Sequence, residues 1–461
     1  MHRWIFLGWS SSAFFASLVF VDQTSPLVGR LTGTAAACHD ESDPDCLDFT
    51  ATQFNSFYIV FYWVGGIVAM FSGFFIARYG VWLTSCLTAA FQFLGMFLFT
   101  LGPYLTSSSS AFALMLIGRL IFSIGLFCQM VLSHQIKSHW FFGKELAVAF
   151  ALYNVSSRLG SIVALSAIGA IVEDVGLQRT LWITLAFGIL SVIGSIVSGW
   201  IYKKHASTSI DAAVYVDSKG IGQFGFRKVL SLCREYWIIT ATVCFVYGPL
   251  LTTIADYPQY LSERYGYTEA AAGQITGIVP DIAICAPVFG IFIDKFGWRD
   301  IINTLSTGLL FLAVILPVAI GNLQPIVTVT LMGVAYSGII VGLWGSIPLV
   351  VSPGDVGVAF GVALSLQSLA TGLLLLVCGI LLDQSDLEAA QRWEFFFILL
   401  ASCGAAAWLL SGVSIFYDHK NPLRPLRMKH VVSVIKTKSN SFIHELTPLI
   451  NGTDVRGTLK K

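Results

Sequence analysis

Charged residues are scarce in this sequence. Only 11% of its 461 residues are charged, against about 25% in soluble domains, while 56% are hydrophobic and the mean hydropathy is +0.76. The formal net charge of +1 provides no overall field that would favour nucleic acid. The nine cysteines form no CxxC pair or metal-ligand spacing, and no nucleophile motif or phosphate loop occurs. We therefore expect a membrane protein that is not an enzyme and binds no cofactor or metal.

Long apolar segments recur along the chain. A helix needs about 20 apolar residues to cross a hydrocarbon core of about 30 Å. The first such segment is too long for the apolar region of a signal peptide, so we interpret it as a retained helix. We predict twelve transmembrane helices, at residues 5–28, 53–77, 81–102, 111–134, 146–172, 178–201, 236–261, 271–294, 301–321, 326–350, 356–382 and 393–417.

Basic residues are distributed unevenly between the two sides that these spans define. One side carries Arg78, Lys137, Lys144, Lys203, Lys204, Lys219, Arg227, Lys228, Arg234, Lys295 and Arg299, and the other carries Arg30, Arg179, Arg264 and Arg392. The positive-inside rule then places both termini in the cytosol. The acidic loop around residues 40–48 faces the opposite, outer or luminal side, where a disulfide between Cys38 and Cys46 is one of two open alternatives.

The sequence contains an internal repeat. GFFIARYG at residues 73–80 recurs as GIFIDKFG at 290–297, and VAF at 148–150 recurs at 358–360, with Glu173 opposite Asp383. The offsets, 217 and 210, are nearly equal. We predict a bundle of six helices at 1–202, a cytosolic loop at 203–235, a second bundle at 236–417 and a cytosolic tail at 418–461.

The two copies of the GxxxxRxG-like pattern resemble the signature loop of the major facilitator superfamily. That resemblance implies a fold of twelve helices in two halves, with a substrate site near the membrane midplane between them. It also implies a gating or structural role for Arg78 and Asp294. The first copy has Ala77 where the family usually has an acidic residue, so the contact made by this loop is expected to be weaker.

Further segments resemble one family within that superfamily, the lysosomal dipeptide carriers called major facilitator superfamily domain-containing protein 1. The resembling segments span about residues 15–415 and include GRLIFSIG at 118–125, WFFGKEL at 140–146, SRLGS at 157–161, GVAFG at 357–361 and SLQSL at 365–369. The resemblance implies passive export of dipeptides, favouring cationic side chains, from lysosome to cytosol. It also implies a glycosylated accessory subunit.

Ionisable residues inside the spans are the first candidates for function, because each is costly in hydrocarbon without a partner or a wet cavity. Arg158 lies well inside span five, and its guanidinium can fork onto a carboxylate. The resemblance matches it to the arginine that holds the peptide carboxylate, while the alternative is a salt bridge to Asp22 or Asp256. We expect Arg119 nearer the cytosolic end of span four, in a gating or structural role.

Three carboxyl groups could accept a substrate ammonium group or a proton: Asp22, Asp256 and Asp281. Asp22 and Asp256 could equally cap or pair, and Asp281 is the candidate for proton coupling. The family has an acidic residue in span four where this chain has Phe127, which puts the preference for cationic dipeptides in doubt. Four aromatic side chains could line a cavity and contact cations, or could simply pack between helices: Tyr58, Trp63, Tyr336 and Trp344.

The tail sequence ELTPLI at residues 445–450 fits an acidic dileucine signal, with Glu445, Leu449 and Ile450 as the residues that cytosolic coat adaptors would read. The sequons at Asn154 and Asn451 fall in a span and in the cytosol, so neither should carry glycan. A second copy of the chain is a further candidate partner.

We expect a lysosomal membrane location, with the plasma membrane as the alternative. The leading function is dipeptide uniport. The alternatives are a proton-coupled or exchanging carrier of amino acids or organic anions, and a non-transporting receptor with a carrier fold.

Overall fold

The computed structural model describes residues 2–34, 38, 45–141, 146–205, 232–296, 298–321, 323–351, 356–384, 386–420 and 426. These residues form helices and connecting turns, without a strand. The helices are α1 (His2–Asp22), α2 (Val28–Leu31), α3 (Ala51–Leu101), α4 (Ser108–Phe141), α5 (Leu146–Val175), α6 (Leu177–His205), α9 (Arg234–Tyr265), α10 (Glu269–Ala283), α11 (Ala286–Phe296), α12 (Arg299–Ala319), α13 (Pro325–Val350), α14 (Val356–Leu382) and α15 (Ala389–Lys420). A 3₁₀ turn, η1, covers Gly102–Tyr104.

Twelve segments of these helices are long and apolar enough to cross a membrane, which confirms the predicted number. The second and third predicted spans are joined in α3, whose 51 residues would extend about 75 Å if straight. Gly80 interrupts the helix with a φ of 76°, a conformation that glycine adopts without steric cost. Ala51–Ser72 and Arg78–Tyr104 are therefore separate spans.

The eighth predicted span is not one continuous helix in the structure. It consists of α10 and α11, with a turn at Ile284 and Cys285 between them. Pro280 lies one turn before this break, where its ring and missing N–H weaken helical hydrogen bonding. The first span likewise ends at Asp22, earlier than expected, and is followed by turns and the short helix α2.

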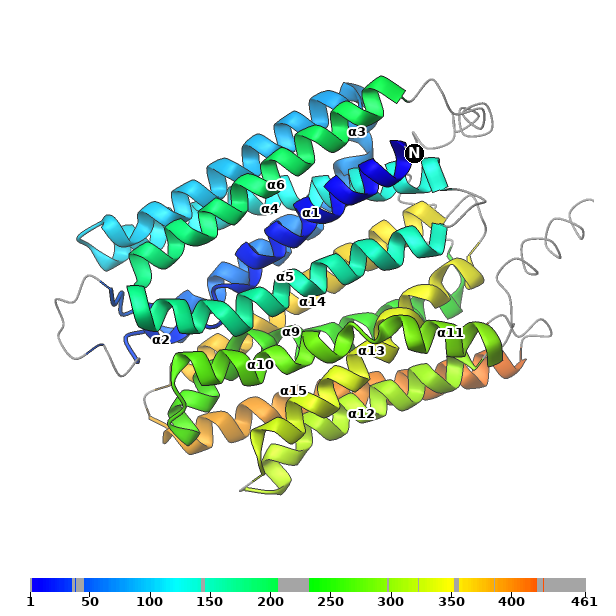
Figure 1. Ribbon diagram of the computed structural model, residues 1–461. Helices are drawn as coiled ribbons and strands as arrows, with labels where there is room; N and C mark the ends of the chain where they lie inside the picture. The colour runs from blue at the N-terminus through cyan, green and yellow to red at the C-terminus, as the bar shows by residue number, and fades with distance from the viewer. Residues whose placement is uncertain are drawn as a thin grey trace, which may run out of the picture.

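The helices form two groups whose axes run in roughly one direction (Figure 1). Helices α1 to α6, from blue to green, occupy the upper part of the view, and α9 to α15, from green to orange, occupy the lower part. We call these groups the first half and the second half. The chain start lies at one end of the bundle and α2 at the opposite end.

We name the two ends by what they carry. The disulfide end includes α2 and the following loop, in which Cys38 and Cys46 are joined by a disulfide with their Cα atoms 5.9 Å apart. The terminal end includes the start of α1 and the end of α6. Lys137 lies near the terminal end but is fully buried inside α4, with its Nζ atom 3.0 Å from the Tyr153 ring centroid. The predicted spans, which end at residue 134 and resume at 146, place Lys137 in a loop, and this placement is therefore wrong.

The two halves meet along a seam where α3 packs on α14 and α5 packs on α10. Glycines permit this close approach, since an added Cβ at each would crowd atoms of the other half. A Cβ at Gly273 would collide with the Leu165 carbonyl, and one at Gly372 would collide with the Trp63 ring. The other seam glycines are Gly66, Gly169, Gly277 and Gly379.

Candidate functional site

Arg158 lies in the middle of α5, on the side that faces the second half. Its Cζ atom is 4.9 Å from the centroid of the Tyr336 ring, which belongs to α13. The guanidinium therefore stacks on an aromatic face across the interface, an arrangement that attracts a cation electrostatically. Its Nε atom has no hydrogen-bond partner among the described residues, so this donor remains available to a ligand.

Asp22 ends α1 beside this arginine. Its carboxyl group neighbours the Ser161 side chain, one turn after Arg158 in α5, and is within electrostatic range of both Arg158 and Arg119. Within the part of the chain that the structure describes, no ion pair of 4.0 Å or less joins Arg158 to Asp22 or to Asp256. The structure thus brings the predicted cation and carboxyl group near each other without the expected salt bridge.

Arg119 is committed to the protein backbone. Its two terminal nitrogens donate to the carbonyls of Phe20 at 3.1 Å and Val21 at 2.7 Å, and one of them also contacts the Thr24 hydroxyl. The side chain is fully buried, and its Cζ atom lies 5.6 Å from the Tyr58 ring centroid. These contacts hold the end of α1, where the last helical carbonyls lack partners within the helix.

The position of Arg119 differs from our expectation. It lies 11 residues after Ser108 and 22 residues before Phe141, the two ends of α4. Helix α4 starts at the disulfide end, so Arg119 is nearer that end and not the terminal end. Its structural assignment is retained as a proposal, with a different location.

An aromatic group from the second half surrounds the Arg158 contact. The Trp344 indole N–H donates to the Tyr247 hydroxyl at 2.8 Å, and the Tyr247 and Tyr336 rings are 6.1 Å apart, edge to face. Trp344 also stacks on Phe360 at 6.0 Å. This group fixes the orientation of Tyr336 through packing, so the face presented to Arg158 is rigid.

Sequence reasoning missed three members of this neighbourhood: Tyr62, Tyr247 and Asn55. Tyr62 is an electrostatic neighbour of Asp22, Tyr58 and Tyr336. The helical spacing of residues 55, 58 and 62 places their side chains on one face of α3, and this pattern could have identified Asn55 and Tyr62. No comparable pattern distinguishes Tyr247 from the many other aromatic residues in the spans.

Tyr58 and Trp63 have different surroundings. Tyr58 is buried, and its hydroxyl has no hydrogen-bond partner in the described ranges. Trp63 instead donates its indole N–H to the Leu369 carbonyl of the second half at 3.0 Å. Trp63 therefore packs across the seam, and its polar atom is already used there.

Asp256 lies away from Arg158, toward the disulfide end, where α9 contacts α3. The carboxyl group is fully buried and accepts a hydrogen bond from the Asn55 amide at 3.3 Å. Its other oxygen, Oδ1, has no partner in the described structure. A buried carboxyl oxygen is costly when unsatisfied, so this position requires a proton, a cation or a water molecule to complete it.

The remaining predicted residues do not join this cluster. Asp281 is exposed, one turn before the break that follows α10. Arg78 is exposed at the end of its span and contacts only the ring of its neighbour Tyr79 among the interactions described, at 5.9 Å. The side chain of Asp294 lies outside the described residues, as do the tail residues Glu445, Leu449 and Ile450.

Phe127 occupies the position in span four where the resembling family has an acidic residue. Its ring is buried and packs 5.2 Å from Phe61, and it fills the space that a Cβ at Gly65 would enter. An apolar ring in this location offers no charge to a cationic substrate. The carboxyl group within electrostatic range of Arg158, that of Asp22, comes from α1.

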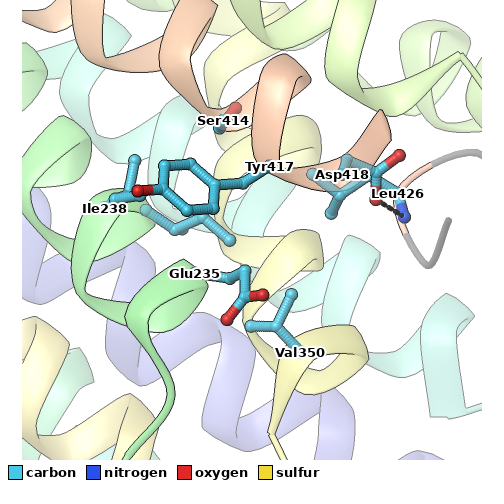
Figure 2. Close-up of a pocket in the computed structure, with 8 residues that line it drawn as sticks. Glu235, Ile238, Val350, Ser414, Tyr417, Asp418 and Leu426 are labelled. Carbon is cyan, nitrogen blue, oxygen red and sulfur yellow. Dashed lines mark hydrogen bonds between the residues drawn. The ribbon is translucent and has the colours of Figure 1, made fainter. Parts of the chain in front are cut away.

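A separate pocket lies at the ends of α9, α13 and α15 (Figure 2). None of the predicted site residues lines it. There the Asp418 carboxylate accepts a hydrogen bond from the Leu426 amide at 3.0 Å, and the Leu426 side chain is buried against Leu349. This contact fixes the start of the tail to the second half.

Comparison with known proteins places this arrangement among carriers. The family model described as Major Facilitator Superfamily matches residues 5–373. A Bos taurus protein named lysosomal dipeptide transporter MFSD1 is 26% identical over 365 residues, covering 77% of this chain and 76% of the relative. The Homo sapiens protein of that name is 26% identical over 366 residues, covering 77% of each chain.

Solved structures show the same fold at lower sequence identity. The nucleoside transporter NupG superimposes with a TM-score of 0.63 and 14% identity, over 89% of this chain and 99% of that chain. A peptide transporter POT mutant with sulfate has a TM-score of 0.65 and 11% identity, over 92% and 96% of the two chains. With the family model covering both halves and the fold in agreement, this chain belongs to the major facilitator superfamily.

Proposed function

We propose that this chain is a lysosomal membrane transporter that exports dipeptides to the cytosol by alternating access, as a uniporter. The observation that carries the proposal is Arg158, whose guanidinium faces the second half with an unpartnered Nε atom. A guanidinium binds a carboxylate with two parallel hydrogen bonds, and a dipeptide presents one carboxylate at its end. The relatives named as lysosomal dipeptide transporters support the substrate class.

The substrate's amino group would meet one of two carboxyl groups, of which only Asp22 is an electrostatic neighbour of Arg158. Asp22 is within electrostatic range of that arginine, and Asp256 is the second candidate, through its unpartnered oxygen. Tyr58, Tyr336 and Trp344 would form the surrounding walls. Because Phe127 contributes no charge, we propose transport of dipeptides without a strict requirement for a cationic side chain.

The proposed orientation places both termini in the cytosol and the disulfide end in the lumen. Arg78 and Asp294 would then stabilise the cytosolic ends of the spans, and the dileucine-type tail would be available to coat adaptors. A glycosylated accessory subunit and a second copy of this chain are proposed partners at the luminal side and within the membrane, respectively.

The test is thermal stabilisation of the purified protein by dipeptides, single amino acids and organic anions, with Arg158→Ala and Arg158→Lys as variants. We expect stabilisation by dipeptides that Arg158→Ala abolishes and Arg158→Lys weakens, since lysine keeps the charge but loses the fork. Stabilisation only by amino acids or anions would contradict the substrate assignment. Stabilisation by dipeptides without uptake into proteoliposomes would support a receptor.

A proton-coupled carrier is the second candidate, and the buried Asp256 carboxyl favours it. Dipeptide uptake into proteoliposomes should then increase with an inward proton gradient and lose this dependence in Asp256→Asn. Gradient-independent uptake by the unsubstituted protein would support uniport. Asp281→Asn is measured in parallel, because Asp281 is the sequence-based candidate for proton coupling, and loss of the dependence in that variant alone would assign the role to Asp281 instead.

A further inference from the structure

Each half of the protein contains a carboxylate that hydrogen-bonds to the start of a helix in the other half. Glu173, near the end of α5, accepts a hydrogen bond at 2.8 Å from the backbone N–H of Ala270 in α10. Asp383, directly after α14, accepts hydrogen bonds from the backbone N–H groups of Ala51 at 2.6 Å and Thr52 at 2.8 Å, in α3. Both contacts lie at the disulfide end of the seam.

The two helix starts leave amides available for these contacts. The first N–H groups of any helix lack partners within it. Thr50 caps α3 by accepting a hydrogen bond from Gln53 N, and Thr268 caps α10 by accepting one from Ala271 N. Each threonine satisfies the third amide of its helix. Asp383 accepts from the first and second amides of α3, and Glu173 accepts from the second amide of α10, at positions where negative charge is also favourable.

The two contacts are copies of one arrangement. Glu173 and Asp383 are 210 residues apart, and the capping residues Thr50 and Thr268 are 218 apart. Both offsets match the internal repeat within a few residues. The first half therefore gives a carboxylate to the second half and receives one in return, at equivalent positions.

We propose that these two contacts form a reciprocal latch that holds the disulfide end of the carrier closed. The latch consists of Glu173 with Ala270, and Asp383 with Ala51 and Thr52. It joins only groups from opposite halves, so it must break whenever this end opens. The ion pair between Arg30 Nε and Glu269 Oε2, at 3.3 Å beside the latch, spans the same interface.

Breaking the latch leaves the interior of each half unchanged. Glu173 and Asp383 are exposed side chains, so water can replace the lost hydrogen bonds on both partners. Such exposed charge interactions contribute modestly, and a modest contribution suits a contact that must open and close in every cycle. The latch thus sets the balance between the closed and open forms of the disulfide end.

The test uses a cysteine at a position that closure buries. Leu165→Cys provides this thiol, because Leu165 is fully buried where α5 meets Gly273. Labelling of this thiol by N-ethylmaleimide, without substrate, is measured by peptide-resolved mass spectrometry. The exposed native Cys285 provides the internal reference for reagent activity. Glu173→Gln, Asp383→Asn and the double variant are made in this background.

We expect each single variant to increase the labelling rate about twofold to fivefold, and the double variant to increase it more, as for a loss of up to about 1 kcal/mol from the closed form. Asp174→Asn and Asp386→Asn are matched controls, because both are exposed neighbours for which the structure describes no contact across the seam, and they should leave labelling unchanged. An unchanged or lower rate in a folded double variant would overturn the proposal. Equal increases in the controls would do so too, since they would indicate a general charge effect.

Discussion

The two arginines at the centre of the first half have opposite surroundings. Arg119 is fully buried and gives its terminal nitrogens to backbone carbonyls at the end of α1. Arg158 stacks on the ring of Tyr336 instead. The Nε atoms of both arginines lack a partner in the described structure, so the contrast lies in the terminal nitrogens of Arg119. Burying either charge in a membrane is costly. The hydrogen bonds of the Arg119 terminal nitrogens to backbone carbonyls offset this cost, so a structural role alone accounts for Arg119.

This difference suggests a general way to separate structural from functional charges inside a membrane. A structural arginine exchanges its hydration for fixed carbonyls that would themselves lack donors. A functional one is left with donors for a transient partner and is stabilised meanwhile by an aromatic face. Substitutions at each should therefore affect different measurements.

The largest effect is expected for Arg119→Ala. Its removal leaves the Phe20 carbonyl without a side-chain donor and the Val21 carbonyl with only the Thr24 hydroxyl, and we expect a loss of about 3 kcal/mol in stability. Thermal unfolding followed by fluorescence of the 12 tryptophans measures it. Arg119→Lys should recover part of the loss, since one ammonium can reach fewer acceptors. An unchanged unfolding temperature in Arg119→Ala would contradict a structural role for Arg119.

Arg158→Ala should have the opposite profile. Because its described contact is an aromatic stack, we expect stability to change by about 1 kcal/mol or less. Dipeptide affinity should fall about 10-fold to 100-fold, as for loss of a charge-assisted hydrogen-bond pair. The contrast between thermal unfolding without ligand and a binding titration separates the two effects. A large loss of stability with unchanged affinity would reverse the assignment.

Tyr336 offers a smaller test of the stack itself. Tyr336→Phe keeps the aromatic face and should retain affinity within about threefold, whereas Tyr336→Leu should lose about 1 kcal/mol of the cation–π contribution, or about fivefold. Binding titrations on both variants provide the measurement. Equal losses in the two would show that the hydroxyl, and not the ring face, supports Arg158.

The smallest effect is expected for Tyr58→Phe. The Tyr58 hydroxyl has no partner among the residues described, so its removal should change stability by less than about 0.5 kcal/mol. The ring near Arg119 is kept. If dipeptide affinity nevertheless falls, the hydroxyl contacts substrate. The substrate site then extends closer to Arg119 than we infer.

Most of the architecture follows from the sequence because the membrane imposes a length on every span. The predicted first residues of α5 and α14, 146 and 356, are the observed ones, and all twelve spans are present. The break between α10 and α11 was not predicted, although Pro280 was visible, because transmembrane helices can tolerate a proline without ending. Lys137 was assigned to a loop because charge alone does not reveal burial against Tyr153.

The site was less predictable than the fold. Arg158 stands out in the sequence as a charge within an apolar segment. Its contact with Tyr336 depends on how two helices of different halves face each other, which no local spacing encodes. The same limit applies to Asp256 and Asn55, separated by 201 residues, and to the hydrogen bond between Trp344 and Tyr247.

The glycine-lined seam between the halves has a consequence for the speed of the transport cycle. Where glycine meets backbone, as at Gly273 and Leu165, there are few interlocked side chains that must change rotamer before the halves separate. Trp63 over Gly372 is a large side chain that must withdraw, whereas the side chains over Gly277 and Gly379 are the smaller Ser166 and Asn55. The activation barrier for switching should therefore arise mainly from polar contacts that water replaces one at a time, which favours rapid exchange between the two open forms.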